Sequence, residues 1–322
     1  MKIVQRAVLA ALVLVGLGAT ASAQDYPNRP VRFIIPFTAG SSTDIVARAL
    51  SERLSGALGQ PVVVENKPGA GGRVGADFVA KSPADGYTIL VNSSAHTVNA
   101  AIYTDLPFDT AKDFAAITAL ANLPNVLIIA PSKGIKTIAE LVAYAKARPG
   151  QLNFASAGVG SGTHMNAEKF RARAGFTHTH VPFRGTPEAI TEVMNGRVDV
   201  YFAPLNAALP FIKDGRVLAL AVGTAQRSPL LPDVPTTIEA GVPASDYDFW
   251  VGMLAPAKTP APIITRLHAE TVKALQSPEL AERLTSLGAT PMPMTPEKFD
   301  AFIRAELAGN AEIVKDAGIK AN

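Results

Sequence analysis

The chain has 322 residues, no cysteine and a formal net charge of +3. The absence of cysteine excludes disulfides, thiolate metal sites and a cysteine nucleophile. The charge is nearly balanced and no basic run occurs, so we expect no nucleic-acid partner. The length and a hydrophobic content of 48% predict two domains with sizeable cores.

The first residues indicate a signal peptide over residues 1–23. Lys2 and Arg6 flank the start of an apolar run, Ala7–Leu17, and Ala21–Ala23 matches the small-residue cleavage pattern. The alternative is an uncleaved anchor, but the apolar run is short for a membrane span. We therefore expect cleavage and export to the periplasm.

Apolar, β-branched runs then alternate with helical patterns along the chain. This alternation is typical of an α/β fold with largely parallel sheets flanked by helices. The predicted strands are Val31–Pro36, Val62–Glu65, Thr88–Val91, Val126–Ala130, Leu152–Ala155, Thr179–Phe183, Asp199–Ala203, Leu218–Val222 and Phe249–Ala255.

The helices between these strands carry clear start and stop signals. Thr43–Leu58 has one apolar stripe, and Thr137–Glu140 forms a capping box. Thr186 and Thr295 are predicted N-caps, because each is followed by proline and then glutamate. Asn195-Gly196 is a good helix stop.

The order of segments predicts two lobes joined by two crossings. Residues 24–125 plus 248–322 are predicted to form domain 1, and residues 126–247 domain 2. The Pro-rich stretch Leu230–Val251 is interpreted as a surface excursion followed by a crossover. The tail from Ile263 is expected to be helical, without a strong strand. A ligand cleft would lie between the lobes.

Two segments about 120 residues apart share one form: an apolar strand, a Gly/Ser loop and a helix start. In the first, Thr38–Asp44, the residues Ala39, Gly40, Ser41 and Ser42 can wrap a carboxylate. Backbone N–H groups and the positive end of the helix favour an anion there. The alternative is an ordinary βα loop with a capping residue.

The second segment is Ser156–His164. Its glycines expose the backbone, and Ser156, Ser161 and Thr163 supply hydroxyls, with Thr163 as the predicted N-cap. His164 would then stand at the first helical position, where the helix dipole lowers the imidazole pKa. A serine hydrolase that pairs Ser161 or Ser156 with His164 is the alternative. No G-x-S-x-G elbow occurs and no acid is obviously placed, so we expect no enzyme.

Other chemistry-bearing residues are weaker candidates. His178 and His180 share a face of a predicted strand, but no third zinc ligand is evident. The glycine-rich stretch 66–75 departs from the dinucleotide fingerprint at Val74. We therefore expect no cofactor and no metal. Polar residues at carboxyl ends of strands complete the candidates, namely Ser93, Ser94, His96, Arg184 and Asn206.

Seven segments in order resemble the Bug family, the periplasmic solute-binding receptors of tripartite tricarboxylate transporters. They are PFTAGSSTDIVAR, ENKPGAGGRVGADFVAKSPADGYT, FASAGVGSGTH, HVPFRGTPEA, VDVYFAP, ALAVGTAQRSPLLPDVPT and WVGMLAPAKTPAP. The resemblance implies a type II periplasmic-binding-protein-like fold and a carboxylate ligand held by both Gly/Ser loops.

The chain departs from the family pattern at two positions. The usual Gly-Gly pair of the first loop is Gly40-Ser41 here, so Ser41 adds a hydroxyl that can change ligand choice. Many members have aspartate where Ala203 stands, a position suited to meeting an amine. Its absence disfavours amino-acid ligands.

From these observations we predict a monomeric receptor for a small carboxylate, either an aromatic acid or a di- or tricarboxylate. Its partners would be the membrane components of a tripartite tricarboxylate transporter, with a sensor that signals to another protein as the alternative. We call Thr38–Asp44 the first cradle and Ser156–His164 the second cradle. The remaining cleft residues would be Phe37, Ser93, His96, Arg184 and Asn206.

Overall fold

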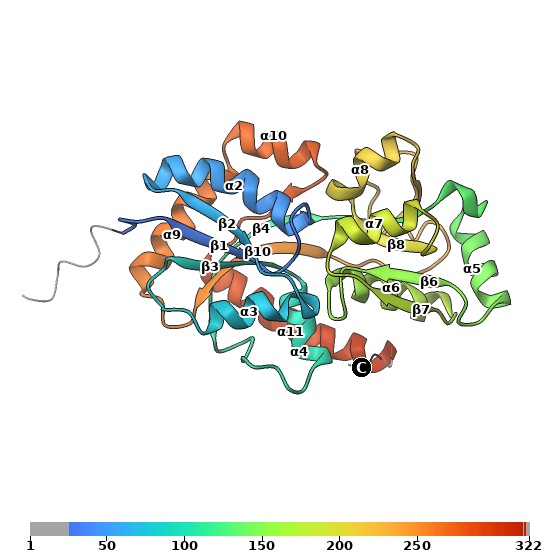
Figure 1. Ribbon diagram of the computed structural model, residues 1–322, viewed down its shortest axis with the longest axis horizontal. Coiled ribbons are helices and arrows are strands. Elements are labelled where there is room, and N and C mark those ends of the chain that lie inside the picture. The colour runs from blue at the N-terminus through green and yellow to red at the C-terminus, as the bar shows by residue number, and fades with distance from the viewer. Residues whose placement is uncertain (1–25, 318, 320–322) are drawn as a thin grey trace, which may run out of the picture.

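Two β-sheets, each covered by helices on both faces, give the molecule two lobes side by side (Figure 1). The computed structural model describes residues 26–317 and residue 319. The predicted signal peptide, residues 1–23, lies outside the described residues. Among the described residues, no helix is long and apolar enough to cross a membrane.

The sheet of lobe 1 has six strands in the order β11-β4-β10-β3-β1-β2. Its strands are β1 (Val31–Ile35), β2 (Val62–Asn66), β3 (Thr88–Ser93), β4 (Phe114–Leu123), β10 (Phe249–Pro256) and β11 (Thr290–Pro291). Its helices are α2 (Ser42–Leu58), η1 (Ala70–Gly72), α3 (Arg73–Ala80), α4 (Ala95–Ile102), α9 (Ala261–Leu275), α10 (Pro278–Ser286) and α11 (Pro296–Ala317).

The sheet of lobe 2 has five strands in the order β7-β6-β8-β5-β9. Its strands are β5 (Asn125–Ile129), β6 (Asn153–Ser156), β7 (Thr179–Pro182), β8 (Val200–Pro204) and β9 (Leu218–Val222). Its helices are η2 (Pro131–Lys133), α5 (Ile138–Ala147), α6 (Gly162–Ala174), α7 (Thr186–Met194) and α8 (Leu205–Lys213).

All nine predicted strands are present, but two further strands were missed. β4 was missed because its sequence, FAAITALANL, has small residues in place of a β-branched run. It is nevertheless mostly buried, since it pairs with β10 on one side and with β11 on the other. β11 has only two residues and gives no periodic signal.

The sheets are mixed rather than largely parallel. β1 pairs parallel with β2 and β3, and β6 pairs parallel with β7 and β8. The antiparallel pairs involve the strands at the crossings, because β4, β5 and β10 run into or out of the junction between the lobes.

The chain passes between the two sheets twice. Only Pro124 separates β4 from β5, and residues 223–248 lead back from β9 to β10 as an irregular segment. The irregular return agrees with the Pro-rich excursion that the sequence predicts. Sheet membership supports the division at residues 125 and 248, which we retain as a prediction.

Apolar clusters lie on both faces of each sheet and hold the helices in place. In lobe 1, α2 and α9 cover one face, and α3 and α11 cover the other. In lobe 2, α5 and α6 cover one face, and α7 and α8 cover the other. Burial of these helix faces fixes the ends of the strands, and therefore the loops that follow them.

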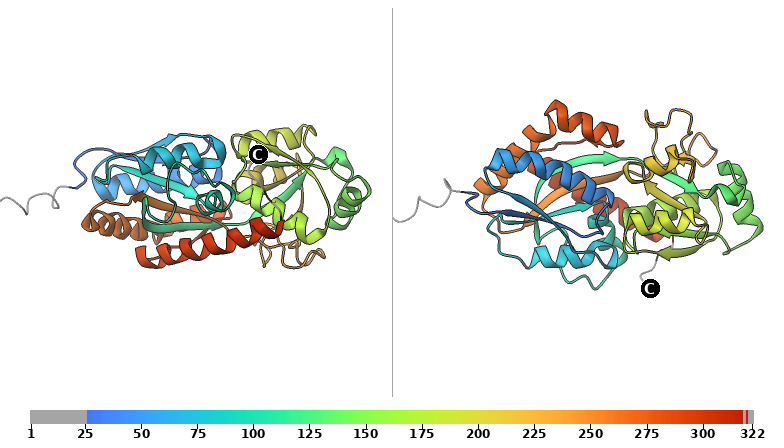
Figure 2. Two further views of the ribbon diagram at one scale, coloured as in Figure 1. Left: turned by 90° about the horizontal axis from the view of Figure 1, so that it is seen from below. Right: turned by 45° about the horizontal axis from the view of Figure 1, so that its top comes forward.

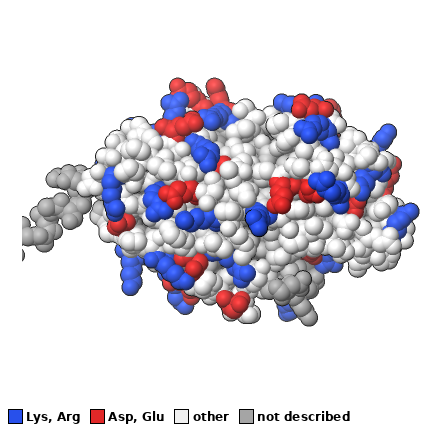
Figure 3. All heavy atoms as spheres, in the orientation of Figure 1, with Lys and Arg blue, Asp and Glu red and all other residues white. Residues whose placement is uncertain are grey.

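Helix α11 lies beneath both lobes (Figure 2). It packs on α4 of lobe 1 and contacts α6 of lobe 2. A small apolar cluster joins Val98 and Ile102 of α4 to Met165 of α6 and to Tyr247. Acidic and basic side chains are interspersed over the face shown in Figure 3.

Candidate anion-binding site

The first cradle wraps its backbone around the N-terminus of α2. Gly40 has a left-handed φ of 76°, and its N–H donates to Asp44 Oδ2 at 2.8 Å. Ser41 is the N-cap, and its Oγ accepts the Asp44 N–H at 3.4 Å. The glycine therefore permits a turn that the capping residues then close.

A buried polar network fixes Asp44. Its carboxylate accepts hydrogen bonds from Arg48 Nε at 2.9 Å and from Asn66 Nδ2 at 2.9 Å. Burial raises the pKa of this carboxyl, but hydrogen bonds from Arg48, the Gly40 N–H and Asn66 outweigh burial and hold it below its usual value. Asp44 therefore supports the first cradle with a charged side chain. We call a residue that supports a cradle in this way a brace.

The second cradle repeats this geometry at α6. Gly160 has a φ of 80°, and its N–H donates to His164 Nδ1 at 3.4 Å. Ser161 is the N-cap, and its Oγ accepts the His164 N–H at 3.2 Å. The prediction of Thr163 as N-cap was therefore wrong. Thr163 Oγ1 instead accepts the Ala157 N–H at 3.0 Å.

The helix begins two residues earlier than predicted, so His164 occupies the third helical position instead of the first. Burial, chiefly, lowers the pKa of His164 to about 4, so the predicted direction is confirmed, whereas the predicted cause was the helix dipole. The same kind of shift occurs at α7, where Gly185 and not Thr186 is the N-cap.

Neighbouring histidines brace the second cradle. His180 stacks on His164, with ring centroids 4.1 Å apart, and its Nε2 lies 2.6 Å from Ser156 Oγ. Ser156 Oγ in turn accepts the Gly158 N–H at 3.1 Å. Burial, chiefly, lowers the pKa of His180 to about 3. The brace is therefore neutral, unlike that of the first cradle.

His178 and Glu168 lie behind this pair. His178 Nε2 is 3.2 Å from Glu168 Oε1, and the His178 ring packs on Phe154. His178 and His180 both face α6, as the alternation predicts. Among the residues that the structure describes, no group of three or more His, Cys, Asp or Glu side chains could hold a metal ion.

The two cradles face one cavity between the lobes. Its space, including the part open to solvent, is about 250 Å³, of which about 10 Å³ admits the centre of a water molecule. The lobes must therefore separate to admit a ligand. The lining residues are Phe37, Ser41, Ser42, Thr43, Ser93, Ala157, Ser161, Gly162, Thr163, Thr186, Pro204 and Phe249.

Five helices begin at this cavity. The lining includes the first residues of α2, α6 and α7, the N-cap residue of α8, and Ser93, which immediately precedes the N-cap of α4. Each helix N-terminus carries roughly half a positive charge together with unpaired N–H groups. No lining residue is charged, so helix termini and hydroxyls would supply the attraction for an anion.

The Ser42 hydroxyl of the lining is free for a ligand. Ser42 is buried, and its Oγ has no hydrogen-bond partner among the described residues. Thr163 and Thr186, by contrast, use their hydroxyls within lobe 2. Phe37, Ala157, Pro204 and Phe249 give the rest of the cavity apolar walls.

The structure brings six of the sixteen predicted site residues to the cavity wall, namely Phe37, Ser41, Ser42, Ser93, Ser161 and Thr163. Among the other cradle residues, Asp44, Ser156 and His164 support the loops from behind this wall. Ala39 and Gly40 are exposed, and Thr38 and Gly160 lie where the lobes meet. Three further wall residues, Thr43, Ala157 and Gly162, lie within the predicted cradles but were not singled out there. Thr186, Pro204 and Phe249 were not predicted as site residues.

Three predicted cleft residues lie elsewhere. His96 is buried in lobe 1 against Phe114, where burial lowers its pKa to about 4. Asn206 is buried in the first turn of α8, and its side-chain amide has no partner among the described residues. Arg184 lines a separate groove at the outer edge of the cleft, together with Gly71 and Val159.

The geometry disfavours the hydrolase alternative. Ser161 Oγ caps α6, and His164 Nδ1 accepts a backbone N–H, so both groups are engaged in the loop. Ser156 meets His180 instead of His164, and it is fully buried. Neither serine has a histidine placed to activate it at the cavity wall.

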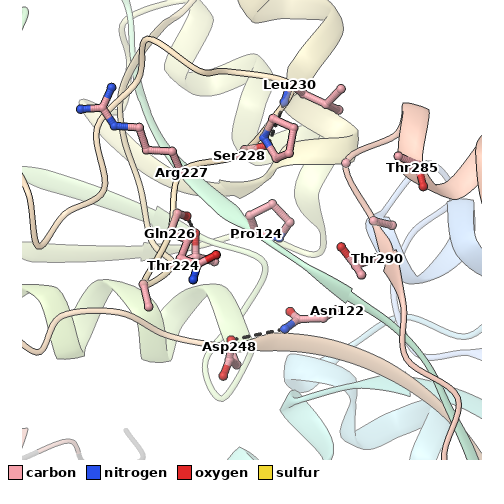
Figure 4. A pocket seen from close by; sticks show the side chains of 14 residues that line it. Asn122, Pro124, Thr224, Gln226, Arg227, Ser228, Leu230, Asp248, Thr285 and Thr290 are labelled. Carbon is pink, nitrogen blue, oxygen red and sulfur yellow. Dashed lines mark hydrogen bonds between the residues drawn. The ribbon is translucent and has the colours of Figure 1, made fainter.

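A more open pocket, with about 440 Å³ open to the centre of a water molecule, lies at the junction of the lobes and not at the cradles (Figure 4). Asn122 donates to Asp248 there, at 3.3 Å, across the two crossing segments. None of its lining residues belongs to a cradle. The cavity at the cradles is the better candidate because helix N-termini and capping hydroxyls converge there.

Two α/β lobes around a central cavity are the architecture of a two-lobed solute-binding protein. Residues 46–319 match the family TctC, described as the tripartite tricarboxylate transporter family receptor. Protein BugT of Bordetella pertussis is 37% identical over 307 residues, which are 95% of this chain and 94% of BugT. The chain belongs to this receptor family, and the resemblance seen in its motifs is confirmed.

Solved structures agree with the fold. Rpa4515 of R. palustris with adipate has a TM-score of 0.89 at 35% identity, and the match covers 92% of this chain and 99% of that chain. MatC of Rhodopseudomonas palustris with bound malate has a TM-score of 0.86 at 32% identity, covering 90% and 100%. The expectation of two lobes of the periplasmic-binding type is thus confirmed.

Proposed function

We propose that this chain is a periplasmic receptor that captures a small dicarboxylate by closure of its two lobes. One carboxylate binds between the cradles, and the membrane components of a tripartite tricarboxylate transporter then receive the ligand. The convergence of five helix N-termini on one uncharged cavity carries this proposal. The chain acts as a binding protein and not as an enzyme.

The chemistry of the cavity supports a carboxylate in particular. A carboxylate accepts several hydrogen bonds at once, and the two cradles offer backbone N–H groups and the Ser42 hydroxyl. The cavity has no carboxylate of its own that would repel an anion or hold an amine. The uncharged Ala203, next to the wall residue Pro204, is consistent with a ligand that lacks an amine.

The choice of a dicarboxylate combines the walls with the relatives. Phe37, Pro204 and Phe249 can pack on a short carbon chain. Adipate and malate, which are named with two structural relatives, are both dicarboxylates. Export to the periplasm follows from the predicted signal peptide and from the family.

Isothermal titration and thermal unfolding with adipate, malate and benzoate test this function. Saturation at 100 times the dissociation constant stabilises the folded state by roughly 2.7 kcal/mol, which raises the melting temperature measurably. Ser42→Ala should weaken binding, because it removes a buried hydroxyl that has no partner among the described residues. Its matched control is Ser286→Ala on the exposed surface of α10. Stabilisation by a neutral solute and by none of the acids would refute the proposal.

A further inference from the structure

The two lobes meet around the anion cavity through glycines. A Cβ on Gly185 of lobe 2 would lie within 3.0 Å of Thr38 Oγ1 of lobe 1. A Cβ on Gly160 would meet Asn99 Oδ1 equally closely, and a Cβ on Gly71 would meet Val159 O. We call these three contacts, Gly185 with Thr38, Gly160 with Asn99 and Gly71 with Val159, the glycine seam.

The seam joins the lobes without hydrogen bonds across it. Asn99 Nδ2 donates to Gly71 O inside lobe 1, at 3.1 Å, and the Gly160 N–H donates to His164 inside lobe 2. Thr38 Oγ1 and Asn99 Oδ1 are buried without a partner among the described residues. The contacts are therefore packing contacts, which form only when the backbones approach closely.

Backbone conformation explains two of the three glycines but not Gly185. Gly71 and Gly160 have left-handed φ values of 63° and 80°. Gly185 has a φ of −179°, which is extended backbone that any residue can adopt. All three of the nearest heavy atoms to its Cβ position belong to the Thr38 side chain. Only the opposite lobe excludes a side chain at residue 185.

The seam also separates two spaces. Thr186, next to Gly185, lines the inner cavity, whereas Gly71 and Val159 line the outer groove of about 400 Å³. The glycine contacts therefore lie between the inner cavity and the groove. Opening of the seam would widen the path between these two spaces.

From these contacts we propose that the glycine seam is the closure latch of the receptor, and that Gly185 sets ligand affinity without touching the ligand. This inference rests on the proposed function. A side chain at residue 185 would hold the lobes apart and reduce the fraction of molecules that can close. Apparent affinity falls in proportion to that fraction.

The first test is adipate affinity, measured by isothermal titration. Gly185→Ala should weaken binding about tenfold or more, while the melting temperature without ligand stays that of the unmodified protein, because the open form accommodates the methyl group. The matched control is Gly309→Ala on α11, where a Cβ has no heavy atom within 4 Å. The control should bind adipate as the unmodified protein does.

A compensating variant separates the interlobe clash from local damage. Thr38→Gly/Gly185→Ala removes the atoms that the new methyl would meet, so it should bind more tightly than Gly185→Ala does. Thr38→Gly alone gives the reference for the loss of the threonine. Unchanged affinity in Gly185→Ala, or no recovery in the double variant relative to that reference, would overturn the inference.

A second test needs no ligand. The chain has no cysteine, so Thr38→Cys/Gly185→Cys contains only the introduced pair. The Gly185 Cβ position lies 3.1 Å from Thr38 Cβ, close to the usual disulfide spacing of roughly 3.5–4.5 Å. Oxidised glutathione should join the two thiols in an intramolecular disulfide, through a mixed disulfide, with release of two molecules of reduced glutathione. In Thr38→Cys/Gly134→Cys, with its second cysteine after η2, no intramolecular disulfide should form.

The two tests separate the failure of each claim. If the disulfide forms but the unmodified protein binds no carboxylate, the proposed function fails and the interlobe contact stands. If the unmodified protein binds adipate but the disulfide does not form, the seam fails and the proposed function stands.

Discussion

The two cradles have the same backbone arrangement, but the side chains that support them differ in charge. The first reads Gly40-Ser-Ser-Thr-Asp44 and the second Gly160-Ser-Gly-Thr-His164. In each, the fifth residue accepts the N–H of a left-handed glycine, and the serine caps the helix. The brace is a carboxylate in one lobe and a neutral imidazole in the other.

This difference offers a way to hold the proposed anion site from two sides. An aspartate tied to Arg48 fixes the first cradle, and its charge is balanced inside lobe 1. A second carboxylate in lobe 2 would add another negative charge near the ligand. A neutral histidine gives the same hydrogen-bond acceptor without that charge.

The largest expected effect is a difference in ligand affinity between substitutions at Gly160 and at Gly40. A Cβ at Gly160 meets Asn99 across the seam, whereas a Cβ at Gly40 first meets Pro187 Cγ at 3.4 Å, an ordinary contact. Both positions carry the left-handed strain of about 1–2 kcal/mol. Gly160→Ala should therefore weaken adipate binding about tenfold beyond Gly40→Ala in isothermal titration, where tenfold is about 1.4 kcal/mol. Equal losses would contradict the assignment of Gly160 to the seam.

The next largest effect is a difference in unfolding free energy between substitutions at the two braces, Asp44 and His164. Asp44→Asn keeps an acceptor for the Gly40 N–H but removes the charge opposite Arg48 in a buried position, which should cost roughly 1–3 kcal/mol of unfolding free energy. His164→Asn places an amide oxygen near the Nδ1 position, so it should cost less. Urea unfolding measures both. Asp214→Asn, on the exposed end of α8, is the control.

How far the sequence predicts this site depends on how local each feature is. Both cradles are predictable because a Gly/Ser loop between a strand and a helix has local chemistry. The cap of α6 was displaced by two residues, since Ser161 and Thr163 both offer a hydroxyl and only the backbone path selects one. β4 has no periodic pattern to detect, because burial between neighbouring strands replaces β-branching there.

The rest of the site depends on contacts between distant segments. Thr186, Pro204 and Phe249 reach the cavity because the sheet order and the lobe junction bring three strand ends together. Arg184 lies only two residues from Thr186, yet it faces the outer groove. A single sequence does not indicate whether a residue near the seam faces the inner cavity or the outer groove.

A smaller effect concerns the pH dependence of stability. As pH falls, the contribution of the histidine brace is lost before that of the aspartate brace. His164, His180 and His96 have pKa values of about 4, 3 and 4 in the folded protein, against an ordinary value of 6.5. The unfolded chain therefore binds more protons as pH falls below about 6.5, and stability decreases toward pH 4. The Asp44 contribution is lost only at lower pH, below its ordinary value of 3.8, because its pKa is lowered.

Urea unfolding at pH 7, 5.5 and 4.5 measures this difference. Each histidine contributes at most about 1.4 kcal/mol per pH unit in the window. The groups that face His164 are Glu168, Arg171, His178 and His180, and none of them is removed in His164→Asn. That variant should lose part of the pH slope, whereas Asp44→Asn should retain it. An unaltered slope in His164→Asn would show that this histidine is not the neutral brace.

The smallest effect concerns Ser41, which departs from the family pattern. Its Oγ caps α2 through a bond of 3.4 Å, longer than the 3.2 Å bond of Ser161 in the other cradle. Replacing a serine cap by glycine costs only a few tenths of a kcal/mol. Ser41→Gly restores the Gly-Gly pair and should leave the unfolding free energy nearly unchanged, with Ser161→Gly as the matched variant.

Because Ser41 also lines the cavity, the ratio of adipate to benzoate affinity is the sensitive measurement. A changed ratio in Ser41→Gly but not in Ser161→Gly would place ligand choice in the first cradle. Equal ratios in both variants would mean that Ser41 acts only as the N-cap of α2 and that the apolar walls determine ligand selectivity.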